Sequence, residues 1–198
     1  MGKEYFSNGR VKNGLKYQTY MEVAGRKLNE TNQEALTEEE KHLFEYTKLN
    51  MKRSERIEKT YSVSAELEEK LLSVKTPQTW MVITEAWCGD SAQNLPYMAK
   101  MATVNPLIDL KILLRDDNLD IMDEYLTNGT RSIPVLIAFD EEGIELFKWG
   151  PRPAEAAALV KKAKEEGKPK DQFIEELHLW YGRNRGKAIE SEFISLLK

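Results

Sequence analysis

The 198-residue sequence has little of what most metal and cofactor sites require. It contains one cysteine, Cys88, and two histidines, His42 and His178. A single cysteine excludes an intrachain disulfide, and so few ligand-type residues leave no metal cluster of recognisable spacing. A glycine-rich phosphate loop is also absent. We therefore expect neither a metal nor another cofactor.

Long apolar runs are absent as well. No stretch approaches the ~20 residues that a membrane helix needs, so we expect no membrane association. The first ten residues, MGKEYFSNGR, lack the apolar core of a secretion signal. A lone cysteine also suits a reducing compartment, and the expected localisation is cytoplasmic.

The charge of the chain is mildly acidic, with a formal net charge of −4. General nucleic-acid binding usually requires a basic face, and we expect none here. One local basic stretch comprises His178, Arg183, Arg185 and Lys187. It is either a patch that binds an anion or a nucleic acid, or a loop with solvated charges between two helices, and the second interpretation is favoured.

The order of expected elements indicates an α/β protein. Residues 64–166 follow the pattern α-β-α-β-α-β-β-α, with strands expected at 79–84, 107–114, 134–139 and 144–149. This order predicts a mixed sheet between helices. Thr37 and Glu40 form a capping-box pattern that predicts a helix over 38–60. The expected organisation is an N-terminal, mostly helical extension (1–63), a central domain (64–166) and a C-terminal helical extension packed on it (167–198).

Cys88 lies where the first strand should end and a helix should begin. The unpaired N–H groups and the dipole at a helix N-terminus favour an anion. They lower the pKa of a thiol, and the thiolate is the nucleophilic form. Such a position favours a functional cysteine over a small buried hydrophobic residue.

Around this cysteine the sequence resembles the thioredoxin family. Trp87-Cys88-Gly89-x-Ser91 stands where that family has Trp-Cys-Gly-Pro-Cys. Pro96 follows at the position of the family's helix proline, Arg131-Ser132-Ile133-Pro134 resembles Arg-Gly-Ile-Pro, and Gly150 follows the last strand. The chain is also similar to bacterial thioredoxin-like proteins that carry Trp-Cys-Gly-Asp after a helical N-terminal stretch.

The resemblance implies a thioredoxin-like fold and assigns the site. Cys88 would be catalytic, and the active-site turn would comprise Trp87, Gly89, Asp90 and Ser91. Ile133 and Pro134 would form the substrate groove. Pro134 would be cis and face Cys88, and an extended substrate would pair with the backbone of Ile133.

Several residues depart from the family pattern. Ser91 replaces the second cysteine, so Cys88 cannot be resolved within the chain. Asp90 and Glu85 place acids near the sulfur, which opposes thiolate formation. Val82 occupies the place of the family's buried acid. Asp90 could cap the following helix, tune Cys88, or do both.

Two functions remain open from the sequence. The first is a monothiol disulfide oxidoreductase that acts on protein or low-molecular-weight disulfides. The second is a non-catalytic thioredoxin-fold module that binds a partner or senses oxidants through Cys88. The additions at both ends suggest a partner surface or a homodimer.

Overall fold

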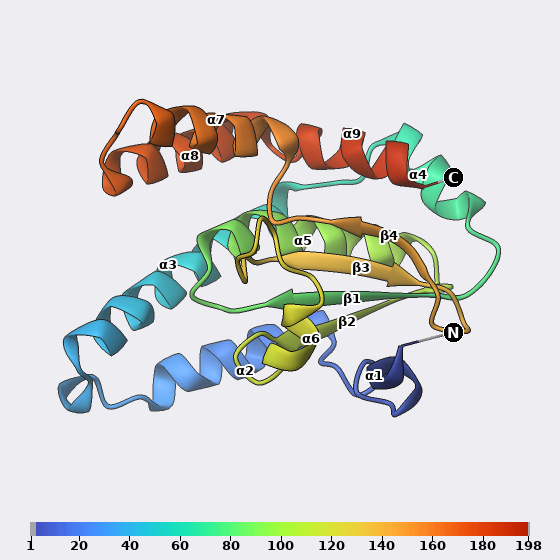
Figure 1. The fold of residues 1–198 in the computed structure, drawn as a ribbon, viewed down its shortest axis with the longest axis horizontal. Coiled ribbons are helices and arrows are strands. Elements are labelled where there is room, and N and C mark those ends of the chain that lie inside the picture. The colour runs from blue at the N-terminus through green and yellow to red at the C-terminus, as the bar shows by residue number, and fades with distance from the viewer. Residues whose placement is uncertain (1–2, 198) are drawn as a thin grey trace.

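The structure is a computed structural model, and it describes residues 3–197. A four-stranded sheet of order β2-β1-β3-β4 lies between helices (Figure 1). Its strands are β1 (Gln78–Thr84), β2 (Ile108–Leu114), β3 (Val135–Phe139) and β4 (Glu145–Trp149). β1 pairs parallel with β2 and antiparallel with β3, and β3 pairs antiparallel with β4. The predicted α/β fold with a mixed central sheet is confirmed.

Helices make up the rest of the regular structure. They are α1 (Glu4–Ser7), α2 (Tyr17–Glu30), α3 (Glu38–Thr60), α4 (Ala65–Ser73), α5 (Gly89–Val104), α6 (Leu119–Asp123), α7 (Ala154–Glu165), α8 (Lys170–Asn184) and α9 (Lys187–Leu196), with a short 3-10 helix at Gln33–Ala35. The predicted capping box is present: Thr37 Oγ1 accepts from Glu40 N, and the Glu40 carboxylate accepts from Thr37 N.

The central strand β1 is buried on both faces, as its uninterrupted apolar sequence predicts. Trp80 and Val82 point into one core cluster, and Met81 and Ile83 point into the other. The first cluster packs β1 against α4, α5 and α9, and the second lies under α1 and α6. Burial of these side chains holds the end of β1, and hence the turn at Cys88, at a defined place.

The N-terminal segment completes the second face of the sheet. Tyr5 and Phe6 are buried there, and the Phe6 ring lies 5.2 Å from that of Phe139. Leu15 then pairs through its backbone with Ile112 at the edge of β2. Five side chains of this segment are buried and contribute to the core: Tyr5, Phe6, Val11, Tyr20 and Ala24.

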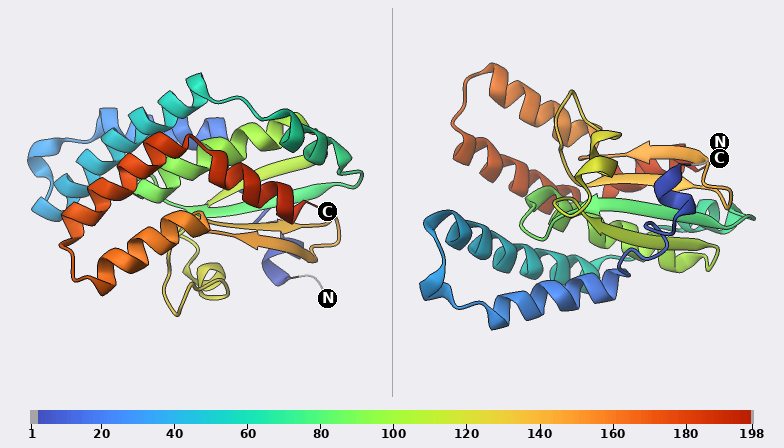
Figure 2. Two further views of the ribbon diagram at one scale, coloured as in Figure 1. Left: turned by 90° about the horizontal axis from the view of Figure 1, so that it is seen from above. Right: turned by 60° about the horizontal axis from the view of Figure 1, so that its bottom comes forward.

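Two helical hairpins extend beyond the end of the sheet where β1 stops. One consists of α2 and α3, and the other of α7 and α8, and Figure 2 shows both projecting on the same side. Within residues 3–197, none of the helices has the length and apolar composition required to cross a bilayer.

The loop interpretation of the basic stretch is correct only for Arg185, which lies between two helices. His178 and Arg183 lie within α8, and Lys187 begins α9. Only Arg185 and Gly186 form the connection, both with left-handed backbone conformation. The buried positions Phe173, Leu177 and Tyr181 carry the helical period of α8 through this stretch.

Candidate active site

Three loops meet at one end of the sheet because of the strand directions. β1 and β4 end there, and β3 begins there. The turn that follows Thr84, the loop before Val135 and the loop after Trp149 are therefore neighbours. The site residues expected from the resemblance lie on the first two of these loops and in the first turn of α5, which follows the first loop.

Cys88 lies at the N-terminus of α5, where it is the N-cap residue. Its side chain is half-buried, and Sγ donates to the carbonyl oxygen of Ile133 at 3.3 Å. The Ile133–Pro134 peptide bond is cis, as the resemblance implied. The structure thus brings Cys88, Ile133 and Pro134 together.

The environment of Cys88 disfavours the thiolate. Burial, followed by the Asp90 carboxylate, raises the pKa of the Cys88 thiol to about 11. Hydrogen bonds from Ser91 and from the backbone N–H groups of Asp90 and Ser91 lower it, but they do not compensate. The sequence predicted that Asp90 opposes the thiolate, and it does, but burial raises the pKa of Cys88 more than this charge does.

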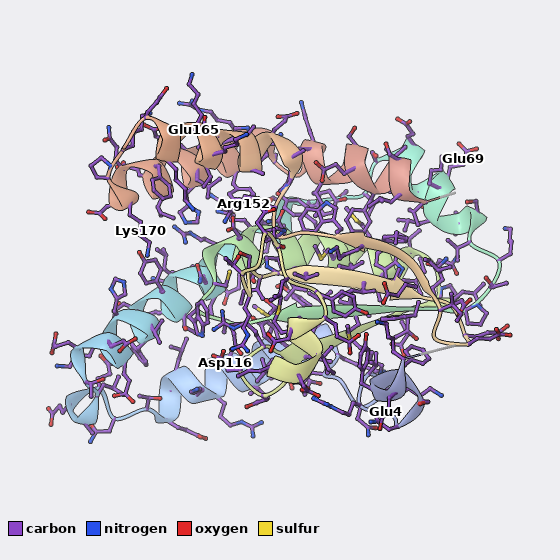
Figure 3. All side chains as sticks on the ribbon, viewed as in Figure 1. Glu4, Glu69, Asp116, Arg152, Glu165 and Lys170 are labelled. Atoms are coloured by element: carbon purple, nitrogen blue, oxygen red, sulfur yellow. The ribbon has the colours of Figure 1, made fainter. Side chains whose placement is uncertain are left out.

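Asp90 does not cap α5, contrary to one interpretation of the sequence. No side-chain cap bond is made at this helix start. Instead, the Asp90 carboxylate forms an ion pair with Arg152 and accepts a hydrogen bond from the Tyr181 hydroxyl at 2.7 Å. Arg152 lies at the base of the α7–α8 hairpin beside α5 (Figure 3). Asp90 therefore joins the active-site turn to the C-terminal helices.

Asn94 extends this network. Its side-chain amide donates to the Asp90 carbonyl at 2.8 Å and to the Tyr181 oxygen at 3.1 Å. Tyr181 is buried, and burial with the adjacent Asp90 charge raises the pKa of its phenol well above the ordinary value. The phenol therefore stays a hydrogen-bond donor to Asp90.

Ser91 is almost fully buried, and its oxygen accepts a hydrogen bond from Thr84 Oγ1 at 2.6 Å. The bond ties the first turn of α5 to the last residue of β1. Val82, at the place of the family's buried acid, lies wholly in the apolar core. The interior beside Cys88 is thus held by hydroxyls and apolar side chains.

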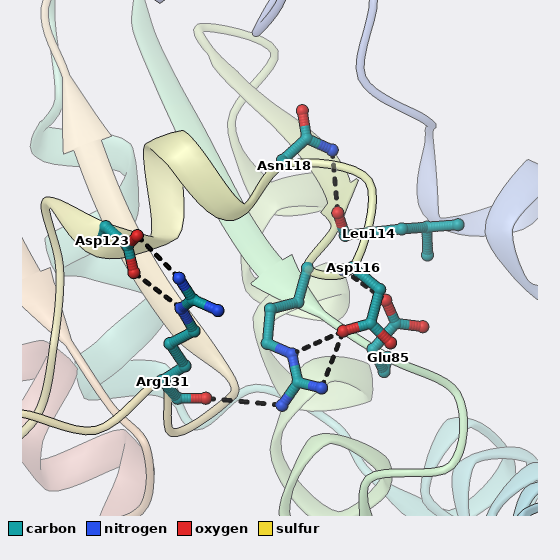
Figure 4. A network of polar contacts seen from close by, with 7 residues as sticks. Glu85, Leu114, Asp116, Asn118, Asp123 and Arg131 are labelled. Atoms are coloured by element: carbon teal, nitrogen blue, oxygen red, sulfur yellow. Dashed lines mark hydrogen bonds and ion pairs between the residues drawn. The ribbon is translucent and has the colours of Figure 1, made fainter.

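Trp87 lies under a cation. The Arg115 guanidinium is 4.7 Å from the centroid of the Trp87 ring, and Arg115 also pairs with Asp116. Glu85 accepts from the backbone N–H of Asp116 at 3.0 Å. Arg115 also donates to the carbonyl oxygen of Arg131 at 3.5 Å, and Figure 4 shows the polar contacts around Glu85, Asp116 and Arg131. These contacts connect the active-site turn to the loop before Pro134.

Gly89 is approached closely by α8. A Cβ atom at this position would lie 3.0 Å from Cε1 and 3.1 Å from Nε2 of His178, and 3.8 Å from Nη1 of Arg53. His178 is hydrogen-bonded to Gln93 at 3.3 Å. Burial, with the nearby charge of Arg53, lowers the pKa of His178 to about 4. An uncharged imidazole and an arginine therefore stand beside the residue that follows Cys88.

Comparison with known proteins shows the family of this chain. A family model described as thioredoxin matches residues 36–164. The chain belongs to the thioredoxin family. A comparison of the sequence with curated proteins found no match.

Two solved structures resemble this thioredoxin-family chain over most of its length. One is a protein of unknown function from Pseudomonas aeruginosa, with 16% identity, a TM-score of 0.59, and coverage of 94% of this chain and 93% of that one. The other is an HIV epitope scaffold, with 18% identity, a TM-score of 0.56 and the same coverage. Both share the fold, and the shared part includes helices before and after the thioredoxin match.

Some site residues of this thioredoxin-family protein escaped the sequence reasoning. Arg152 was not among the expected site residues, although the loop after β4 must lie near the end of β1. Arg53, Tyr181 and His178 come from helices outside the motif-bearing region. An acid in place of the turn proline was the one signal that a cationic partner should be sought.

Gly89→Ala tests the contact between the turn and α8. The new methyl group must displace His178, so we expect the free energy of unfolding to fall by about 1 kcal/mol in urea denaturation. Gly182→Ala is the control: it is also helical, its Cβ would meet nothing within 4 Å, and it should raise stability by about 0.5 kcal/mol. Equal effects of the two changes would contradict the close approach of His178 to Gly89.

Proposed function

We propose that this protein performs thiol–disulfide exchange through Cys88 as a single thiol. One observation carries the proposal: Cys88 Sγ lies at the start of α5 against the Ile133 carbonyl and the cis-Pro134 loop. A disulfide presented along that loop has one of its sulfur atoms next to Cys88. Trp87, Ile133 and Pro134 would border the bound substrate.

The chemistry requires two exchanges. The Cys88 thiolate attacks one sulfur of a disulfide RS–SR′, an S–S bond forms between Cys88 and RS, and R′S⁻ leaves and takes up a proton. A small thiol R″SH then attacks the RS sulfur as its thiolate, forms RS–SR″ and returns the Cys88 thiolate. Ser91 supplies no thiol, so the second step requires this external thiol.

The raised pKa of Cys88 sets the speed of the first step. With a pKa near 11, only about one thiol in ten thousand is ionised at pH 7, and the thiolate is the attacking species. The proposed enzyme is therefore slow in its resting state, and any bound group that lowers this pKa would accelerate it.

The pH dependence of Cys88 alkylation tests this assignment. Because the thiolate fraction rises until the pH reaches the pKa, we expect the iodoacetamide rate to increase about tenfold per pH unit from pH 7 to 10 without a plateau. Asp90→Asn removes a charge that raises this pKa and should move the profile to lower pH. A plateau of the alkylation rate below pH 8 in the wild-type protein would contradict the raised pKa of Cys88.

Turnover distinguishes the exchange from simple reactivity. A mixed-disulfide substrate with a small thiol as regenerant should be reduced by the wild-type protein at pH 8.5, and Cys88→Ala should have only the uncatalysed rate. Turnover that persists in Cys88→Ala would refute the proposal.

The raised thiol pKa also favours a second candidate. In that case the thioredoxin fold binds a partner through the Ile133–Pro134 groove, and Cys88 serves as an oxidant sensor or has no chemical role. The distinguishing result is absence of turnover by a wild-type protein whose partner binding is retained in Cys88→Ala.

A further inference from the structure

A cleft of about 800 Å³ lies between α3 and α8, on the inner sides of the two hairpins. Figure 2 shows how these hairpins project past the sheet. The residues at its inner end are Arg53, Arg56, Gln93 and His178. Since Arg53 and His178 both approach Gly89, this inner end adjoins the active-site turn. The volume suits a small molecule, for which sites of about 300–1,000 Å³ are usual.

The side chain of Arg53 is held in place by hydrogen bonds, but its charge is not neutralised by a carboxylate within residues 3–197. Its Nη1 donates to Asn50 Oδ1 at 2.9 Å, and the buried Asn50 amide donates to the carbonyl of Ala86 in the active-site turn at 3.0 Å. Among the described residues, neither Arg53 nor Arg56 takes part in an ion pair within 4.0 Å. A half-buried guanidinium without a carboxylate partner is costly unless an anion completes it.

The charges along the cleft are unevenly placed. Its three carboxylates are Glu45, Asp171 and Glu175. Glu45 lies eight residues before Arg53 on α3, about 12 Å along the helix. Asp171 and Glu175 are two turns and one turn before His178 on α8. The inner end therefore holds two arginines and an uncharged imidazole, whereas the acids and the two lysines that also line the cleft, Lys48 and Lys52, lie nearer the hairpin tips.

We propose that the inner end of this cleft binds the carboxylate of an anionic low-molecular-weight disulfide and places its sulfur beside Cys88. Arg53 is the main ligand, since a guanidinium pairs with a carboxylate through two parallel hydrogen bonds. His178 and Gln93 supply further polar contacts. The inference rests on the proposed exchange at Cys88 and names its substrate class; the covalent step is the first exchange described above.

Three small disulfides of different charge test the proposal. They are 3,3′-dithiodipropionate (anionic), bis(2-hydroxyethyl) disulfide (neutral) and cystamine (cationic). After correction for the intrinsic reactivity of each with a model thiol, we expect Cys88 to react with the anionic disulfide roughly tenfold faster than with the neutral one, and slowest with cystamine. Equal corrected rates would overturn the inference while leaving the exchange intact.

Substitutions on α3 test which residue causes the preference for the anionic disulfide. Arg53→Gln should abolish the preference for the anionic disulfide, and Arg53→Lys, which keeps the charge, should retain part of it. Lys59→Gln makes the same charge change on the same helix but lies outside the cleft-lining residues, and it should leave the preference unchanged. A similar loss in Lys59→Gln would show a general charge effect and overturn the site.

A binding measurement tests the anion-binding site independently of the exchange reaction at Cys88. In a Cys88→Ser protein, 3,3′-dithiodipropionate should shift the imidazole proton resonances of His178, assigned with the help of His42→Gln, and the neutral disulfide should not. If wild-type Cys88 reacts with none of the three disulfides but this shift appears, the proposed exchange at Cys88 is refuted and the proposed anion-binding site is supported. If the shift is absent, the anion site fails.

Discussion

Replacing Arg152 with methionine is expected to lower the free energy of unfolding by about 3 kcal/mol. The Asp90 side chain is only 10% exposed, and Arg152 is its ion-pair partner. Removing the guanidinium leaves a carboxylate in a poorly solvated place, where the loss of the partner costs more than the pair contributes. Methionine keeps most of the side-chain volume, so the change in stability reports mainly on charge.

Urea denaturation of a double-mutant cycle checks this result. Asp90→Asn retains an acceptor for the Tyr181 hydroxyl, and the double variant Asp90→Asn/Arg152→Met should be more stable than Arg152→Met alone. Arg131→Met is the control, because the Arg131–Asp123 pair is exposed on both sides and should contribute much less. Similar losses in Arg152→Met and Arg131→Met would contradict a buried role for the Asp90 pair.

Gly150→Ala is expected to have the largest effect on stability, a loss of about 4 kcal/mol. Gly150 has φ +125°, and a Cβ atom there would collide with the carbonyl oxygen of Pro134. Two costs therefore add: the backbone conformation disfavours a side chain, and the loop that carries Pro134 must move. That loop also carries the Ile133 carbonyl that contacts Cys88.

Gly167→Ala carries only the first of these costs, that of the backbone conformation. Gly167 also has positive φ, +68°, but a Cβ there would meet nothing within 4 Å. It should lose only about 1 kcal/mol, and it should leave the alkylation rate of Cys88 unchanged. Gly150→Ala should change that rate as well as the stability. An equal loss in both variants would show that the Pro134 contact contributes nothing.

Local sequence signals predicted the fold well. The Thr37–Glu40 capping box located the start of α3, and the apolar run from Trp80 to Ile83 located the central strand, because each depends on residues that are neighbours in the chain. The turn around Cys88 and the cis bond before Pro134 followed from motifs in the correct order. The domain boundaries at 63 and 166 remain predictions, as do the assigned roles of the site residues.

The charge environment of Cys88 could not be derived in this way. Arg152 lies 62 residues and Tyr181 91 residues from Asp90. Their meeting depends on how α7 and α8 fold back over the end of the sheet, and no periodic pattern encodes that direction. The sequence showed the acids Asp90 and Glu85 beside Cys88, but it did not show that Arg152 pairs with the Asp90 carboxylate.

The pairing of Leu15 with Ile112 has a consequence for solution behaviour. It covers part of the outer edge of β2, a strand that would otherwise present unpaired backbone groups to a second molecule. The opposite edge strand, β4, is five residues long and carries Glu145 and Lys148. Within residues 3–197, neither edge of this sheet offers a long apolar template, so growth of the sheet from one molecule to the next is disfavoured at high concentration.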